Sequence, residues 1–187
     1  MLSRQNTRNF WPWSPKVPTR KIPTNIERQT SSGYLLKPVA SPPAMRIPKV
    51  VPVVLRGDSA ALEVLVFAHP QAGMQIVKGT VEPGESVNEA ASRELFEESG
   101  ITGAKCVRDL GTWEQCPPGQ LWHFREMDVS QSLPESWAHF TLDGGGYTFR
   151  FSWHPLSGPA PCTCHPVFVA ALEFLHVQVA AHGANRK

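Results

Sequence analysis

Three glutamates that lie close together give this sequence its clearest chemical signal. Glu94, Glu97 and Glu98 are separated by three and four residues, within a segment whose pattern is helical. Residues at positions i, i+3 and i+4 lie on one face of a helix, so this spacing brings three carboxylates together. Such a group can hold a metal ion, or it can be a solvated acidic face, which is the more common role of a charge run.

The three charges destabilise a helix unless something compensates for them. Like charges four residues apart cost roughly 0.2–0.5 kcal/mol. Glu97 and Glu98 also occupy the last helical turn, where the helix dipole disfavours an anion by roughly 0.3–1 kcal/mol each. A bound divalent cation would more than offset both effects. Carboxylates without His or Cys beside them favour a hard ion, so we expect Mg²⁺ first and Mn²⁺ second.

A helix over residues 86–99 is predicted to carry these glutamates. Ser86 followed by Glu89 has the pattern of a capping box at the start of a helix, and Gly100 is a typical residue just after its end. An apolar row at a spacing of four predicts the buried stripe of this helix: Val87, Ala91 and Leu95.

Strands are expected on both sides of the acidic helix. Residues 50–55 and 62–67 are two apolar, β-branched runs around a Gly-Asp turn signal, which predicts a hairpin. Pro52 suggests that the first run is an edge strand, because proline has no N–H to donate to a neighbour. Further strands are expected at four segments: 74–77, 106–114, 121–129 and 147–153.

Two segments complete the expected architecture. Residues 130–146 end in three glycines and are predicted to be a loop, whereas residues 166–180 are predicted to form a closing helix. Strands mixed with two helices in this order predict an α+β fold in which helices cover a mixed β-sheet.

The residues around the acidic helix resemble the Nudix box, the signature of the Nudix hydrolase superfamily. The box has nine fixed positions over 23 residues, and this chain fills all of them between residues 79 and 101 without a gap. The resemblance implies an α/β/α sandwich and extends to residues 46–187. The matching residues are Gly79, Glu85, Arg93, Glu94, Leu95, Glu97, Glu98, Gly100 and Ile101.

The resemblance also implies roles for the residues at matching positions. The carboxylates of Glu94, Glu97 and Glu98 and the carbonyl of Gly79 would bind the metal. Glu98 or Glu97 would act in catalysis, with Glu98 activating a water molecule or orienting the base. Arg93 would act with them by pairing with a carboxylate of the box, either Glu85 or Glu97. The reaction implied is attack of water on a nucleoside diphosphate linked to a second group.

Four residues are candidates for contacts with the substrate. Lys78 directly precedes the box, in a version of the motif similar to that of dinucleoside polyphosphate and diphosphoinositol polyphosphate hydrolases. Glu85 lies at the start of the box. Trp113 could stack on a base, which is worth roughly 1–3 kcal/mol, although a tryptophan most often packs in a core. His123 is a candidate base on a predicted strand, although an ordinary strand histidine is the more common case.

Several substrates and one different function remain open at this point. The version of the box favours a polyphosphate-bearing substrate, with ADP-ribose or a nucleotide sugar as the alternative. The 5′ end of an RNA is a further substrate, which an acidic body disfavours. A non-catalytic module that senses a nucleotide is the reading from another class. A homodimer is compatible with the sequence, and nucleic acid is not the expected partner.

The charge of the chain is unevenly distributed. Residues 1–45 hold seven prolines and seven cations against one acid, whereas residues 46–187 hold 11 cations and 15 acids. This composition predicts a disordered basic extension before an acidic domain. A transit peptide and a true start at Met45 are the alternatives. No apolar run reaches the ~20 residues of a membrane span, and no secretory signal pattern is present, so we expect a cytoplasmic protein.

Overall fold

The structure, a computed structural model, describes residues 46–58, 61–114, 117–142 and 145–183. The basic extension predicted over residues 1–45 lies outside these residues, as does Met45. Both remain predictions. The description below concerns the part of the chain that holds the acidic helix.

Eight strands form one mixed sheet, and its path runs β5-β6-β1-β2-β8-β7. β4 pairs with β1 and β3 pairs with β2 beside this path. β1 and β6 run parallel, whereas the other pairs are antiparallel. The strands are β1 (Ile47–Arg56), β2 (Glu63–His69), β3 (Gly73–Gln75), β4 (Gly79–Thr80), β5 (Lys105–Trp113), β6 (Gln120–Asp128), β7 (Ser136–Thr141) and β8 (Tyr147–Pro155).

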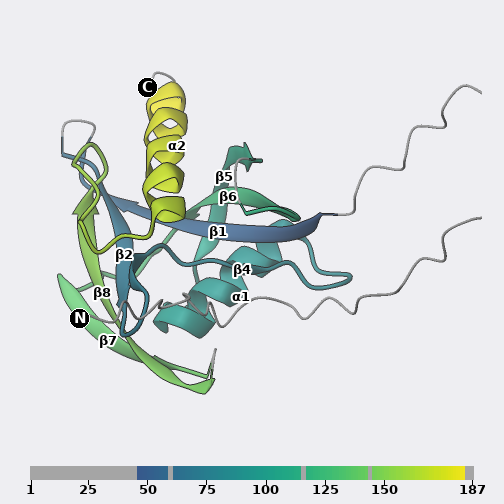
Figure 1. Cartoon of the computed structure of the whole chain (residues 1–187), viewed down its shortest axis with the longest axis horizontal. Coiled ribbons are helices and arrows are strands. Elements are labelled where there is room, and N and C mark those ends of the chain that lie inside the picture. The colour runs from purple at the N-terminus through teal and green to yellow at the C-terminus, as the bar shows by residue number, and fades with distance from the viewer. Residues whose placement is uncertain (1–45, 59–60, 115–116, 143–144, 184–187) are drawn as a thin grey trace, which may run out of the picture. The chain divides into compact units, whose positions relative to one another are not determined.

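Two helices cover opposite faces of β1, α1 (Val87–Ser99) on one side and α2 (Pro166–Gly183) on the other (Figure 1). Residues of β1 alternate between them: Val51 and Val53 lie in the core beneath α2, whereas Val50 and Val54 lie in the core beneath α1. This alternation is the period-two pattern of a strand buried on both faces. The predicted helix-covered mixed sheet is therefore confirmed.

The prediction that β1 is an edge strand is wrong, because β1 lies between β6 and β2. Pro52 is tolerated for a local reason. The carbonyl of Pro48 accepts from Val81 beside β4, whereas the N–H of Ile47 donates to Gly119 beside β6. The backbone groups of even-numbered β1 residues therefore point away from β6, towards β4 and β2. Pro52 lies between the short stretch of β1 that pairs with β4 and the short stretch that pairs with β2, so its missing N–H interrupts neither pairing.

Other strand predictions hold in part. The hairpin exists, but β1 and β2 pair only at Leu55–Val64 and Arg56–Glu63 among the described residues. The strand expected at 74–77 is the shorter β3. The loop predicted for residues 130–146 is wrong, because it contains β7, which pairs along its whole length with β8. β7 is half exposed on the sheet edge, so its sequence lacks the apolar run that marks an inner strand.

Local sequence determines where α1 begins and ends. The hydroxyl of Ser86 accepts from the N–H of Glu89, and the Glu89 carboxylate accepts from the N–H of Ser86, which completes the predicted capping box. Gly100 ends the helix in the left-handed conformation, with φ of 77°, and its N–H donates to the carbonyl of Phe96. These contacts fix the two ends of the helix that carries the acidic residues.

α2 is apolar enough and long enough, by composition and length, to cross a membrane. In the structure, 28% of this span is buried, and its buried side chains fill the core on their face of the sheet. The same test is passed by core helices, so it is weak evidence for a membrane span. The buried residues are Phe168, Ala171, Leu172, Leu175 and Val179.

Candidate active site

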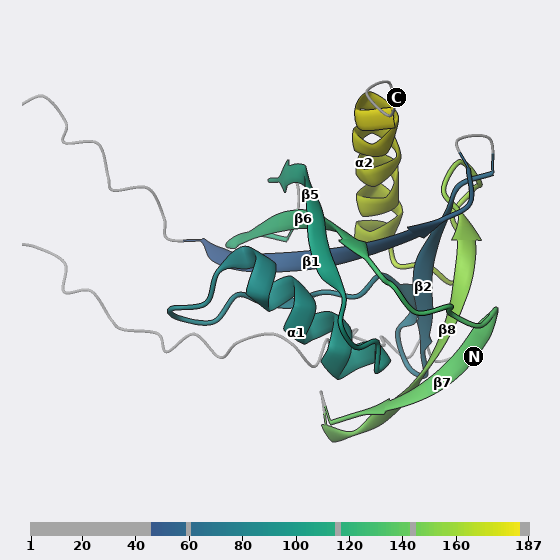
Figure 2. The ribbon, with the colours of Figure 1, turned by 180° about the vertical axis from the view of Figure 1, so that it is seen from behind.

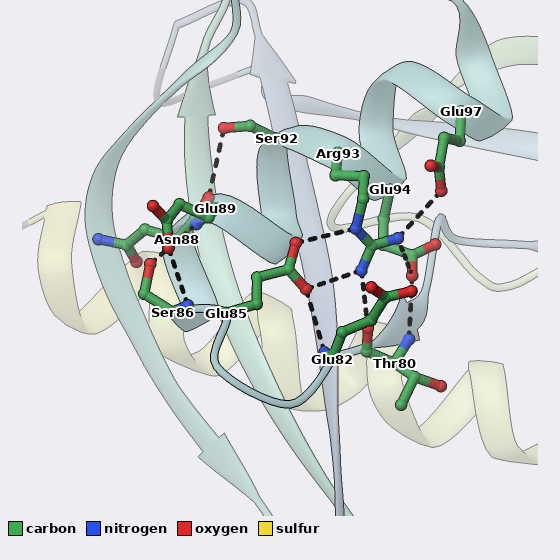
Figure 3. Close-up of polar contacts among 10 residues, drawn as sticks. All are labelled: Thr80, Glu82, Glu85, Ser86, Asn88, Glu89, Ser92, Arg93, Glu94 and Glu97. Atoms are coloured by element: carbon green, nitrogen blue, oxygen red, sulfur yellow. Dashed lines mark hydrogen bonds and ion pairs between the residues drawn. The ribbon is translucent and has the colours of Figure 1, made fainter.

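Arg93 lies at the centre of the acidic residues (Figure 3). Its Nε and one terminal nitrogen donate to the two oxygens of Glu85, at 2.8 and 2.9 Å. The other terminal nitrogen donates to Glu94 at 2.9 Å and to Glu97 at 3.0 Å. The terminal nitrogen that contacts Glu85 also donates to the carbonyl of Thr80, at 2.9 Å. One guanidinium therefore connects the loop before α1, two turns of the helix and β4.

The surroundings of Arg93 shift the pKa values of its partners in opposite directions. Hydrogen bonds from Arg93 lower the pKa of Glu85 to about 2. Burial raises the pKa of Glu94, although Arg93 and the N–H of Thr80 act in the other direction. Glu94 thus lies in a place where its negative charge is poorly solvated, and an added cation would favour the charged form.

The lowered pKa of Glu85 predicts that the folded chain loses free energy of unfolding in acid. Its pKa in the folded chain is about 2, below its ordinary value of 4.5. Its contribution is therefore fully present above about pH 4.5 and is lost as the pH falls towards 2. In urea unfolding at several pH values, Glu85→Gln should flatten the fall in unfolding free energy across this window. Glu173→Gln, which is exposed on α2, should leave the fall unchanged; an equal fall in wild type and Glu85→Gln would contradict the assignment.

Gly79 in β4 lies directly against the side chain of Glu94 in α1. A Cβ built on Gly79 would lie 1.6–1.9 Å from the carboxylate atoms of Glu94. The same carboxylate accepts from the N–H of Thr80 at 3.0 Å. Only glycine therefore leaves room for this carboxylate against β4, beside the backbone carbonyl that the resemblance assigns to the metal.

Replacing Gly79 with alanine should displace the Glu94 carboxylate, because the Cβ has no space. We expect kcat to fall at least about 10-fold, since misplacing a group by ~1 Å can cost ~100-fold. Steady-state turnover and thermal unfolding measure the two effects. Gly183→Ala is the control, because a Cβ there would meet nothing within 4 Å. Unchanged turnover in Gly79→Ala would show that this contact has no role in the reaction.

The three glutamates differ in exposure. The side chain of Glu94 is 12% exposed and that of Glu97 is 51% exposed. Glu98 is buried, with 5% of the residue exposed. Glu94 and Glu98, four residues apart, both face the sheet, whereas Glu97 lies at the margin of the helix face. Among the described residues, no three His, Cys, Asp or Glu side chains are arranged so that they could together hold a metal ion.

Lys78 lies on the opposite face of β4 from Glu94. Its ammonium group lies 5.2 Å from the ring centroid of Trp122. On the same face, the ammonium group of Lys49 donates to the hydroxyl of Thr80. Two cations thus lie beside the short strand that carries Gly79. Lys49 was not singled out from the sequence, because only the pairing of β1 with β4 brings it here.

Trp113 is placed away from the acidic helix. It is 5% exposed and packs in the core beneath α2, edge-on to Trp122 at 5.2 Å. The stacking role predicted for Trp113 is therefore wrong, because alternation along β5 directs its ring towards α2 rather than towards solvent.

His123 lies on the α1 face of the sheet. It pairs with Val50, which in turn pairs with Gly79, so it is two strands from Gly79 or roughly 10 Å at the usual spacing. Its Nδ1 is 3.3 Å from the hydroxyl of Thr112. Burial lowers the pKa of His123, and the charge of Arg125 acts in the same direction. A neutral imidazole is thus favoured at the edge of the candidate site.

A family model of the NUDIX domain matches residues 45–158 of the chain. The chain belongs to the Nudix family. The resemblance seen in the acidic helix is thereby confirmed, and the chain is classed as a Nudix hydrolase that keeps every fixed residue of the box. No curated protein matches the sequence.

Solved structures share the Nudix fold with this chain. An ADP-ribose pyrophosphatase from Streptococcus suis 89-1591 is 12% identical, with a TM-score of 0.53 over 75% of this chain and 92% of that one. A MutT protein from Methanosarcina mazei Go1 is 20% identical, with a TM-score of 0.53 over 79% and 100%. A UDP-X diphosphatase is 15% identical, with a TM-score of 0.52 over 78% and 68%. At these identities the likeness concerns the fold.

Nudix hydrolases need a divalent metal, and the donors of this box suit a hard one. The resemblance assigns this role to carboxylate oxygens and one backbone carbonyl, on Glu94, Glu97, Glu98 and Gly79. The room left by Gly79 for a carboxylate, and the burial of Glu98 beside the sheet, fit such an ion. Hard ions of this kind are commonly held by a few carboxylates, with water and substrate phosphates completing the shell. An open donor set is therefore compatible with the metal that the family uses.

Proposed function

We propose that this chain is a Mg²⁺-dependent pyrophosphohydrolase acting on nucleoside diphosphates linked to a second group. The Arg93 network carries the proposal, because it holds the carboxylates of Glu85, Glu94 and Glu97 in one arrangement. A helix kept only for stability gains nothing from carboxylates in its last turn. Three glutamates around one arginine, beside a buried fourth, are better explained by a cation bound during the reaction.

The residues of the chain have separate tasks in this proposal. Glu94, Glu97, Glu98 and the carbonyl of Gly79 hold the ion, which when bound neutralises the diphosphate and lowers the pKa of the attacking water. Glu98 accepts the proton of that water or orients the group that does. Arg93 keeps the carboxylates of Glu94 and Glu97 in place between turnovers. Water attacks one phosphorus atom, and the bridging oxygen leaves with the second phosphate.

A substrate with more than two phosphates, such as a dinucleoside polyphosphate, suits the surface beside β4 best. Lys49 and Lys78 lie on the face opposite Glu94, close to Thr80. Because the ion would lie on the other face of the strand, only phosphates that pass round β4 would reach these ammonium groups. ADP-ribose and nucleotide sugars carry two phosphates, so they extend a shorter distance from the ion.

A panel assay tests both the reaction and the substrate. Hydrolysis is measured with Mg²⁺ for a dinucleoside tetraphosphate, ADP-ribose, a nucleotide sugar and nucleoside triphosphates. Lys78→Gln should lower kcat/KM for the tetraphosphate about 10-fold, the worth of one charge-assisted hydrogen bond, and change ADP-ribose hydrolysis less. Lys105→Gln, exposed on β5, is the control. Tight nucleotide binding without turnover of any compound would instead indicate a sensing module.

A further inference from the structure

The last turn of α1 is tied to β7 by two side chains of that strand. The indole Nε1 of Trp137 donates to the carbonyl of Ser99 at 2.9 Å. The Nε2 of His139 is 3.2 Å from the carbonyl of Glu97, and it carries the proton because a carbonyl oxygen only accepts. The imidazole also packs on Gly100, where an added Cβ would lie 2.8 Å from its Nδ1. Figure 2 shows this end of α1 beside β7.

These two donors supply what the helix end lacks. The last carbonyls of a helix have no partner within the helix, and cationic side chains often compensate for them. The last turn of α1 has no basic residue. Its own chain satisfies the carbonyls of Leu95 and Phe96 through the Ser99 hydroxyl and the Gly100 N–H. The carbonyls of Glu97 and Ser99 receive their donors from β7.

The strand that supplies the donors is itself firmly held. β7 pairs with β8 at every position from Ser136 to Thr141. The ring of Trp137 stacks on that of Phe151, with centroids 5.0 Å apart and planes 14° apart. The two hydrogen bonds therefore connect the end of α1 to a fixed framework rather than to a loop.

We propose that Trp137 and His139 are positioning residues for the metal-binding turn. They fix the position of the last helical turn along the helix axis and its rotation about that axis. Because this turn carries Glu97 and Glu98, both carboxylates can then contact one ion. Distances from oxygen to Mg²⁺ lie near 2.0–2.1 Å, so a shift of the turn by a fraction of an ångström spoils the shell. This inference rests on the proposed function, because the ion is the one proposed there.

Binding of Mn²⁺ alone to the full-length chain, followed by electron paramagnetic resonance, tests the proposal without substrate. His139→Phe keeps a ring on Gly100 and removes the donor, and Trp137→Phe keeps the stack on Phe151 and removes the indole N–H. We expect the double variant to bind Mn²⁺ about 10-fold more weakly, the usual scale for groups that orient metal ligands. Each single variant should lose part of that affinity, so the test stands even if the double variant fails to fold.

Two further variants separate positioning from general stability. Trp153→Phe removes a similar indole bond, of 3.0 Å to the carbonyl of Pro134, away from α1. It should leave Mn²⁺ affinity unchanged, even if the melting temperature falls. His139→Gln retains a donor and should restore most of the affinity lost in His139→Phe. Amide hydrogen exchange should rise in the last turn of α1 in Trp137→Phe and not in Trp153→Phe.

The outcomes distinguish this inference from the proposed function. If the wild type binds Mn²⁺ and hydrolyses a nucleotide, but the Trp137 and His139 variants bind Mn²⁺ within about twofold of it, the positioning role is overturned and the enzyme stands. A wild type that neither binds Mn²⁺ nor hydrolyses any compound overturns both. Equal weakening in Trp153→Phe would show that general stability, not the position of the turn, sets the affinity.

Discussion

Glu98→Gln is expected to abolish hydrolysis while leaving the fold intact. Glu98 is buried against the sheet, and glutamine has the same shape without the charge. If Glu98 activates the water, its loss removes roughly 10²–10⁴-fold of the rate, and a weaker hold on the metal lowers turnover further. We therefore expect kcat to fall by at least about 1,000-fold.

The stability of this variant gives the prediction a second readout. Glutamine keeps the size and shape of the buried side chain, so Glu98→Gln should melt close to the wild-type temperature in metal-free buffer. Glu89→Gln is the matched control, because glutamine also serves at that position of a capping box. It should keep turnover near the wild-type value. A Glu98→Gln variant that retains a tenth of wild-type kcat would contradict the assigned role.

Arg93→Lys is expected to lose both stability and turnover. Lysine keeps the charge but cannot form the planar fork that contacts both oxygens of Glu85. The side chains of Glu85 and Glu94 are 15% and 12% exposed, so water only partly replaces the lost donors. We expect the free energy of unfolding in urea to fall by about 2–3 kcal/mol. Turnover should fall about 10–100-fold, because two carboxylates proposed to hold the metal are no longer fixed.

A double-mutant cycle makes the prediction specific to the network. In Arg93→Lys, the Glu85 carboxylate is the partner that loses the most hydrogen bonds, and Glu85→Gln removes that carboxylate. The loss of unfolding free energy in the double variant should therefore be smaller than the sum of the losses in the two single variants. Arg150→Lys, exposed on β8, is the control and should be neutral within about 0.5 kcal/mol. Additive effects of Arg93→Lys and Glu85→Gln would show that the two side chains do not depend on each other.

The features that sequence reasoning predicted well are those with local causes. α1 was predicted to within a residue, because the bonds of Ser86, Glu89 and Gly100 all join residues three or four positions apart. A contact of Arg93 with either Glu85 or Glu97 was expected from the resemblance, and the structure contains both. The closing helix was also expected from its apolar pattern.

The features that were missed depend on contacts distant in the sequence. Trp137 and His139 meet α1 across 38 and 42 residues, which no local pattern encodes. Trp113 alternates correctly along its strand, but alternation does not say which helix covers which face. Pro52 was assigned to an edge because the sequence cannot show that β1 has β6 on one side and an interrupted pairing on the other.

The interrupted pairing of β1 has a mechanical consequence. Among the described residues β1 and β2 pair at only two positions, so few backbone hydrogen bonds hold the sheet together between these two strands. α1 contacts β1, β4, β5 and β6 on one side of this junction and β7 and β8 on the other. α1 therefore bridges two parts of the sheet, β1, β4, β5 and β6 on one side and β7 and β8 on the other, that are joined to each other by few backbone hydrogen bonds. We therefore expect a change that separates the two parts of the sheet to move α1, and with it the turn that carries Glu97 and Glu98.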